Sequence, residues 1–143
     1  MFVLSEGEFT TIDFPDAFNT GGDAGGINTR GDIVGRYRDV VGGPFHGFLL
    51  SGGDFTSIDF PEAFSTRAYG IAPDGETIVG DYCSDRGCIG AGAGHWHGFL
   101  LSGGEFSSFD FPDAIFTQAW KINSAGQIVG RYKRTDGRFM CLY

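Results

Sequence analysis

Short apolar stretches alternate with small polar segments along the whole chain, and none of them has the 3.6-residue spacing of an amphipathic helix. Each stretch ends at Gly, Asp, Asn, Ser or Pro, the residues that favour tight turns between strands. The sequence Ser-Gly-Gly-Asp at 51–54, for example, separates two apolar runs. The pattern predicts an all-β protein of short antiparallel strands joined by hairpin turns.

The same pattern occurs three times. Asp13, Asp59 and Asp110 each stand in the block Phe-x-x-(Ile or Phe)-Asp-Phe-Pro-(Asp or Glu)-Ala, and successive copies are 46 and 51 residues apart. A Gly-Ile or Lys-Ile pair followed by Ile-Val-Gly recurs at 26–35, 70–80 and 121–130, and His-Gly-Phe-Leu-Leu-Ser recurs at 46–51 and 97–102. Periods of this length are typical of repeat architectures. We expect one domain, residues 1–143, of three repeats at about 1–45, 46–96 and 97–143.

Each unit contains four expected strands, which we name a to d in chain order. Strand a carries Gly-Ile, strand b Ile-Val-Gly, strand c Gly-Phe-Leu-Leu, and strand d Phe-x-x-Ile-Asp-Phe. Degenerate copies of the strand c sequence occur at 2–5 and 138–143. The chain therefore reads c-d, a-b-c-d, a-b-c-d, a-b-c, with one strand c in excess.

The units resemble the HAF-type extracellular repeat, named for a His-Ala-Phe tripeptide that appears here as His-Gly-Phe at 46–48 and 97–99. The resemblance covers most of the chain and implies β-propeller blades, which are four-stranded sheets arranged radially. Three blades do not close a ring, so we expect a homodimer with six blades. A β-trefoil monomer is the alternative, because three units of four strands also fit that fold.

Composition narrows the classes of function. The 143 residues are 41% hydrophobic, which is enough for a folded core, and their net charge of −8 disfavours a nucleic-acid partner. No apolar run approaches the length of a membrane-spanning helix, and no signal peptide is visible. The expected location is either cytoplasmic or, after removal of a leader, extracellular. Cys83 and Cys88 are expected either to pair or to stay as free thiols.

Carboxylates follow the repeated proline in all three units, at Asp16, Glu62 and Asp113. In a propeller these positions share one face with the b–c loops. Carboxylate oxygens are the ligands that calcium prefers, so the three residues are the candidate calcium ligands. Plain solvated side chains are the alternative.

Two histidines, His95 and His97, are the candidate catalytic residues, because a histidine can act as a general base or hold a metal. His97 repeats His46, which favours a structural role for it, whereas His95 has no counterpart. The candidate substrate-binding residues are aromatic or basic side chains near the expected channel, with packing between blades as the alternative: Tyr69, Trp96, Trp120 and Arg67.

Two functions from different classes follow. Six-bladed propellers with a central calcium include lactonases of the gluconolactonase and paraoxonase kind. By this analogy of architecture, the chain is expected to be a calcium-dependent hydrolase that opens small lactones, including N-acyl homoserine lactones. The alternative is a non-catalytic module that binds a glycan or a protein.

Overall fold

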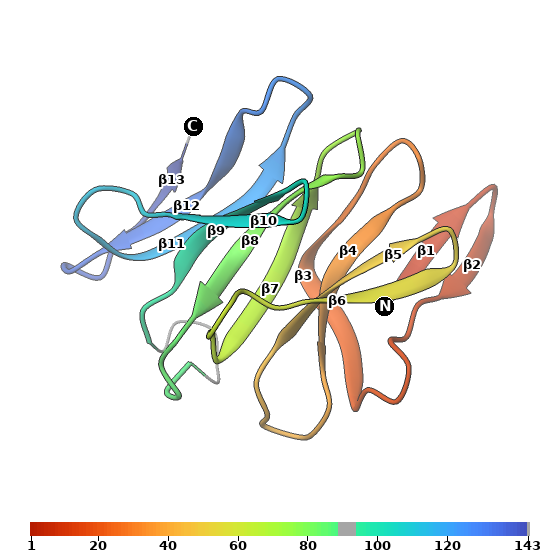
Figure 1. Cartoon of the computed structure of the whole chain (residues 1–143), viewed down its shortest axis with the longest axis horizontal. Coiled ribbons are helices and arrows are strands. Elements are labelled where there is room, and N and C mark those ends of the chain that lie inside the picture. Colours follow the sequence, from red (N-terminus) through yellow and green to blue (C-terminus); the bar gives the residue numbers. More distant parts are fainter. Residues whose placement is uncertain (89–93, 143) are drawn as a thin grey trace.

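The structure, a computed structural model, describes residues 1–88 and 94–142. Over these residues the chain forms thirteen strands in four antiparallel sheets and no helix (Figure 1). The all-β prediction is confirmed. Within one chain the described sheets form neither a closed ring of blades nor a trefoil.

Two of the sheets have four strands each, in simple meander order. The first consists of β3 (Asn19–Ile27), β4 (Ile33–Arg38), β5 (His46–Ser51) and β6 (Asp54–Ile58). The second consists of β7 (Ser65–Ile71), β8 (Thr77–Cys83), β9 (His97–Ser102) and β10 (Glu105–Phe109). Strands a, b, c and d of the sequence repeat are thus neighbours in space as well as in the chain.

The remaining two sheets lie at the ends of the chain. An N-terminal hairpin consists of β1 (Phe2–Ser5) and β2 (Glu8–Thr11), which are strands c and d of a unit without a and b. A three-stranded sheet consists of β11 (Ala114–Ile122), β12 (Ile128–Arg134) and β13 (Phe139–Leu142), which are strands a, b and c without d.

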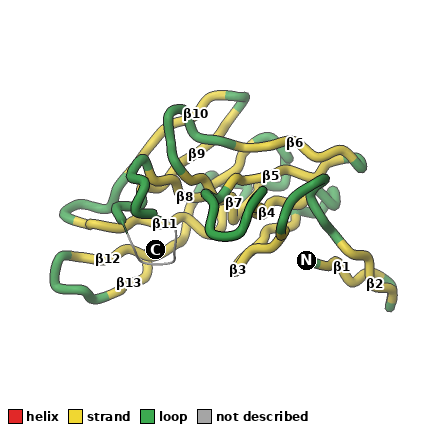
Figure 2. The backbone as a smooth tube through the Cα atoms, turned by 90° about the horizontal axis from the view of Figure 1, so that it is seen from below, coloured by secondary structure: helices red, strands yellow, loops and turns green. Residues whose placement is uncertain are grey.

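The sheets follow one another across the molecule in chain order, with the hairpin and the three-stranded sheet at opposite ends (Figure 1). Strand β7 lies against β3 and β4 of the preceding sheet, and β11 lies against β7 and β8. The tube in Figure 2 shows the same succession from a second direction. Strand a of the second and third units, β7 and β11, therefore forms the contact with the unit before it.

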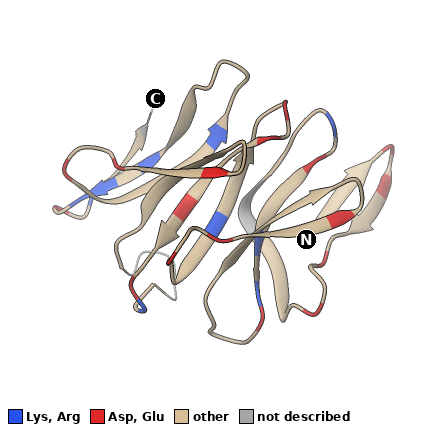
Figure 3. Ribbon diagram, in the orientation of Figure 1, with Lys and Arg blue, Asp and Glu red and all other residues tan. Residues whose placement is uncertain are grey.

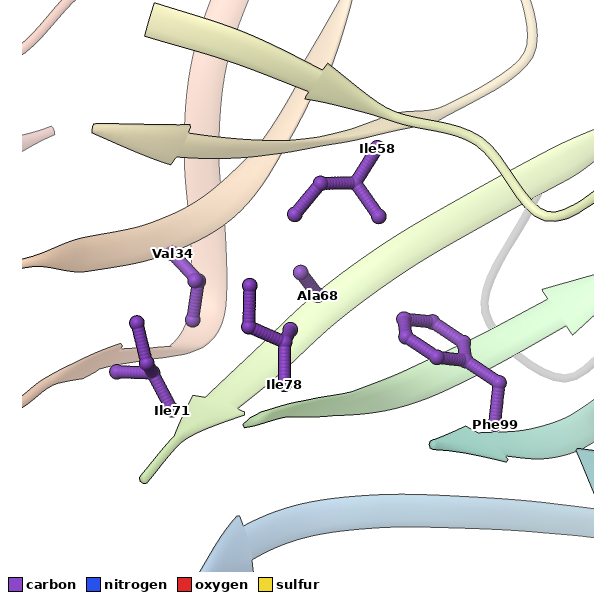
Figure 4. Close-up of a cluster of buried hydrophobic side chains, with 6 residues drawn as sticks. All are labelled: Val34, Ile58, Ala68, Ile71, Ile78 and Phe99. Atoms are coloured by element: carbon purple, nitrogen blue, oxygen red, sulfur yellow. The ribbon is translucent and has the colours of Figure 1, made fainter. Parts of the chain in front are cut away.

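The core lies between successive sheets. Val34 and Ile58 of the first four-stranded sheet pack against Ala68, Ile71 and Ile78 of the second (Figure 4). A similar cluster, with Ile12 and Ile33 at its centre, joins the hairpin to the first four-stranded sheet. Successive side chains of a strand point to opposite faces, so an inner strand such as β7, buried throughout, contributes one row to each face of its sheet.

Glycines of strand a allow this close approach. A Cβ atom on Gly26 would lie 2.7 Å from the carbonyl oxygen of Tyr69, and one on Gly70 would lie 2.7 Å from that of Trp120. Both distances are too short for any side chain. The repeated glycine before the isoleucine thus sets the spacing between neighbouring sheets.

Candidate functional site

A buried polar network occupies the junction between the second four-stranded sheet and the three-stranded sheet. Arg67 of β7 and Asp81 of β8 stand directly opposite each other, and the arginine Nε lies 2.8 Å from the aspartate Oδ1. A second bond joins the guanidinium to Oδ2, which makes the pair bidentate. Their exposed fractions are 2% and 0%, so the ion pair is enclosed.

Gln118 of β11 extends this network into the next sheet. Its side-chain Nε2 donates to Asp81 Oδ2 at 3.0 Å and to the Tyr69 hydroxyl at 2.9 Å, while its Oε1 accepts a bond from Arg131 Nε at 2.9 Å. Both amide hydrogens of the glutamine therefore have acceptors. Burial raises the pKa of Asp81, and the charge of Arg67 and the bonds from Arg67 and Gln118 counteract that effect.

Aromatic rings enclose the arginine. The Cζ atom of Arg67 lies 3.6 Å from the centroid of the Trp96 ring, and Arg38 stacks in the same way on Phe45 at 3.7 Å. Both rings are buried, and they belong to a cluster that also contains the Cys83–Cys88 disulfide. These cation–π contacts stabilise the charge of each guanidinium within the interior.

Three of the four candidate substrate-binding residues, Arg67, Tyr69 and Trp96, thus come together in the structure, but inside it. The fourth, Trp120, is half-buried on β11, with Arg131 5.3 Å from its ring centroid. An enclosed cluster whose polar atoms bond one another stabilises the junction between sheets. It offers a substrate no surface within one chain.

The candidate catalytic residue His97 forms a repeated contact. Its Nδ1 lies 2.8 Å from the carboxylate of Asp110, and its ring is 5.2 Å from the ring of Tyr82. His46 makes the same contact with Asp59 at 2.8 Å, and its ring is 5.1 Å from Tyr37. The histidine, the carboxylate of strand d and the tyrosine of strand b form one motif that occurs in both four-stranded sheets.

Hydrogen bonding and nearby charges raise the pKa of His46. The hydrogen bond to Asp59 raises the pKa of His46, and the charges of Asp59 and Asp39 add to that effect. The other candidate, His95, is exposed and precedes β9. Among residues 1–88 and 94–142, it forms no hydrogen bond or ion pair with His97 or with a carboxylate.

The candidate calcium ligands occupy three equivalent turns. Each follows a proline, and the backbone N–H of the next alanine donates to the carbonyl of the phenylalanine before the proline at 3.0–3.2 Å. Asp16, Glu62 and Asp113 have φ of 60°, 61° and 60°, the left-handed value that a type II turn needs at its third position. All three are exposed.

Calcium binding needs six to eight oxygen ligands at about 2.3–2.6 Å. The turns place Asp16, Glu62 and Asp113 singly, one at each junction between sheets. Among residues 1–88 and 94–142, no group of three His, Cys, Asp or Glu side chains comes close enough to hold a metal ion. Most of the acidic residues lie in turns and at strand ends, whereas Asp81 lies within β8 (Figure 3). The three residues do not fit a calcium site within one chain, and the calcium assignment stays a prediction.

Asp81 and Gln118 were missed by the sequence reasoning. The signal for Asp81 was present, because a charged residue follows the glycine of strand b in every unit, at Arg36, Asp81 and Arg131. A charge within an otherwise apolar strand indicates a buried partner. Nothing comparable marks Gln118, whose partners Asp81 and Tyr69 are 37 and 49 residues away in the chain.

Comparisons with protein-family models, curated proteins and solved structures find no match to this chain. The resemblance to the HAF-type repeat therefore rests on the quoted motifs and stays a prediction. The part of the chain that the structure describes has no helix able to span a membrane.

Proposed function

We propose that this chain is a non-catalytic binding module, and that its sheets are blades of a six-bladed β-propeller formed by two copies. The strand order of each four-stranded sheet and the contacts of β7 and β11 with the preceding sheets support this arrangement. A ring built this way presents its turns on two faces, where a glycan or a protein would bind. The trefoil monomer is the alternative.

Exposed apolar residues on β12 and on β3 support a missing neighbour at each end of the row of sheets. Val34 and Val79 of strand b are both 0% exposed between sheets, whereas their equivalent on β12, Val129, is 42% exposed. On strand a, Ile71 is 6% exposed, but its equivalent Ile27 is 57% exposed. The valine row of one copy and the isoleucine row of another would restore the contact that the inner sheets make.

The duplicated histidine motif carries the non-catalytic proposal. A catalytic site needs unlike residues at one place, but His97–Asp110 and His46–Asp59 have the same 2.8 Å contact and similar ring stacking. Contacts that recur in each sheet serve the packing of strands b, c and d. We therefore assign both pairs to structure.

Solution mass tests the ring. Light scattering behind a sizing column should give about 31 kDa, twice the 15.4 kDa of one chain. Val129→Asp should reduce the mass to that of one chain, because it places a charge in the proposed contact. The control Thr10→Asp changes an exposed position of β2 and should leave the mass unchanged. A wild-type mass near 15 kDa would refute the ring and favour a closed monomer.

The calcium-dependent lactonase is the second candidate. One observation favours it: His97 is held by a carboxylate while 37% of its side chain is exposed, which suits a general base. The matched variants His97→Ala and His46→Ala separate the two functions. The binding module predicts similar losses of stability and no lactone opening in any sample, with or without EDTA. Turnover by the wild type that only His97→Ala and EDTA abolish would establish the hydrolase instead.

A further inference from the structure

We propose that the hairpin β1–β2 of a second copy pairs with β12 in place of β13, giving a composite sheet β11–β12–β1–β2. This inference rests on the proposed ring of two copies and specifies its interface. The segment that would pair with this edge of β12 is thus a defined part of the same chain. In a single copy, β13 occupies the edge instead.

The hairpin already has the form of the outer half of a four-stranded sheet. Leu4 stands opposite Phe9 in its register, as Leu50 stands opposite Phe55 in the first four-stranded sheet. Phe2 and Phe9 meet edge to face with centroids 5.3 Å apart. The equivalent pairs, Phe48 with Phe55 and Phe99 with Phe106, meet in the same way at 5.6 Å.

The three-stranded sheet has the complementary half. In both complete sheets, the phenylalanine of the turn before strand a stacks on the tyrosine of strand b, with centroids 3.7 Å apart for Phe14–Tyr37 and 3.6 Å for Phe60–Tyr82. The same stack is present here as Phe111–Tyr132 at 3.7 Å.

In the complete sheets these two halves touch. Phe14 lies 5.4 Å from Phe55, and Phe60 lies 5.3 Å from Phe106, again edge to face. In one chain of this protein, Phe2 and Phe9 are 63% and 70% exposed. Joining the hairpin of one copy to β12 of another would complete the repeated four-ring cluster and bury this apolar surface.

Strand β13 is a poor substitute for a proper strand c. Met140 stands opposite Tyr132, where the complete sheets have His46 and His97 opposite their tyrosines. The Tyr132 hydroxyl donates to Met140 Sδ, a weak acceptor. In the complete sheets the tyrosine hydroxyl instead bonds a serine of strand d, at 2.8 Å for Ser57 and 2.7 Å for Ser108.

The hairpin supplies the hydroxyl that β13 lacks. Thr11 of β2 occupies the position of Ser57 and Ser108 and carries the hydroxyl that Tyr132 would meet. The register of the complete sheets, in which Val34 stands opposite Leu49, places Val3 of the second copy opposite Val129. Val3 already packs toward the first four-stranded sheet of its own chain, the same side on which Val129 is exposed.

The natural cysteine of β13 allows a direct test. Arg131 and Cys141 stand opposite each other in the β12–β13 register, so Arg131→Cys places two thiols within reach of a disulfide. The oxidised variant keeps β13 locked on β12. We expect its dimer to dissociate at least about tenfold more readily than that of the double variant Arg131→Cys/Cys141→Ser, which cannot lock.

Dithiothreitol should restore the dimer of the locked variant, and the wild type with and without this reductant controls for its effect on Cys83–Cys88. A locked variant as dimeric as its control would overturn the composite sheet but leave the ring intact. A monomeric wild type would overturn both. In a second measurement, Val3→Cys/Val129→Cys, made in Cys141→Ser, should form a covalent dimer on a non-reducing gel. A dimer by mass without that covalent band would also overturn the composite sheet.

Discussion

Removal of the carboxylate of Asp81 should destabilise the fold more than almost any other single polar substitution. The Arg67 side chain is only 2% exposed, so Asp81→Ala removes its bidentate partner inside the protein. The substitution also removes one acceptor from Gln118. Breaking a buried pair by removing one partner costs about 3–5 kcal/mol. Domains of this size have about 5–15 kcal/mol of stability in total. The variant should therefore lose about a fifth of its stability or more.

Urea unfolding followed by tryptophan fluorescence measures this loss, because Trp96 lies directly over Arg67. The midpoint should fall while the m-value stays the same. The control Asp54→Ala removes an exposed carboxylate and should change stability by less than about 0.5 kcal/mol. A double variant, Arg67→Met/Asp81→Leu, removes both charges and should recover most of the loss. If Asp81→Ala costs less than about 1 kcal/mol, the enclosed ion pair does not stabilise the junction.

Two further predictions concern the turns and the histidine motif. Glu62→Gly should stabilise the protein by up to about 1 kcal/mol in thermal or urea unfolding, because glycine adopts the positive φ of this turn without strain. A loss of stability would mean that the carboxylate itself is needed. The pKa of His46 is raised in the folded state, so its pairing with Asp59 adds stability. That stability is fully present below the pKa of the unfolded chain, about 6.5, and is lost as the pH rises through the pKa of the folded state. The difference in unfolding free energy between wild type and His46→Gln, measured from pH 5.5 to 8.5, should shrink with rising pH, and a constant difference would contradict this linkage.

Much of the fold follows from local sequence. Each Ser-Gly-Gly turn supplies two positive φ values, 58° and 88° at Gly52 and Gly53, and so fixes the hairpin between β5 and β6. The apolar runs Ile33–Arg38 and Thr77–Cys83 form inner strands whose consecutive residues are buried on both faces. These features depend on residues close together in the chain, which is why the repeat predicted all thirteen strands without knowledge of how the sheets pack.

The candidate site could be predicted only in part, because its contacts cross between units. The proline of the Phe-Pro-Glu turn restricts the chain so that Glu62 adopts positive φ, and the sequence alone gave its carboxylate a metal-binding role instead. Trp96 and Arg67 were both selected as candidates, but their mutual stacking and burial depend on the packing of β7 against the segment before β9. No local pattern distinguishes an aromatic ring at a channel from one between sheets.

The departures from the repeat are as informative as the repeat itself. At one position of strand a the three units have Gly21, Arg67 and Gln118, and the middle unit alone has an aspartate, Asp81, after the glycine of strand b. Because Asp81 accepts from Arg67 within its own sheet and from Gln118 of the next, only the observed neighbour satisfies it. Three interchangeable units could stack in any order or continue indefinitely. A buried charge that needs one particular glutamine makes the junction between the second and third units specific, a role in which buried polar groups have measurable value. In the proposed ring, the outer junction between β12 and a second copy would have no such pair among the described residues and would depend on aromatic and aliphatic side chains. The junction between the second and third units therefore specifies which sheets pack together, whereas the outer one would allow association without covalent continuity.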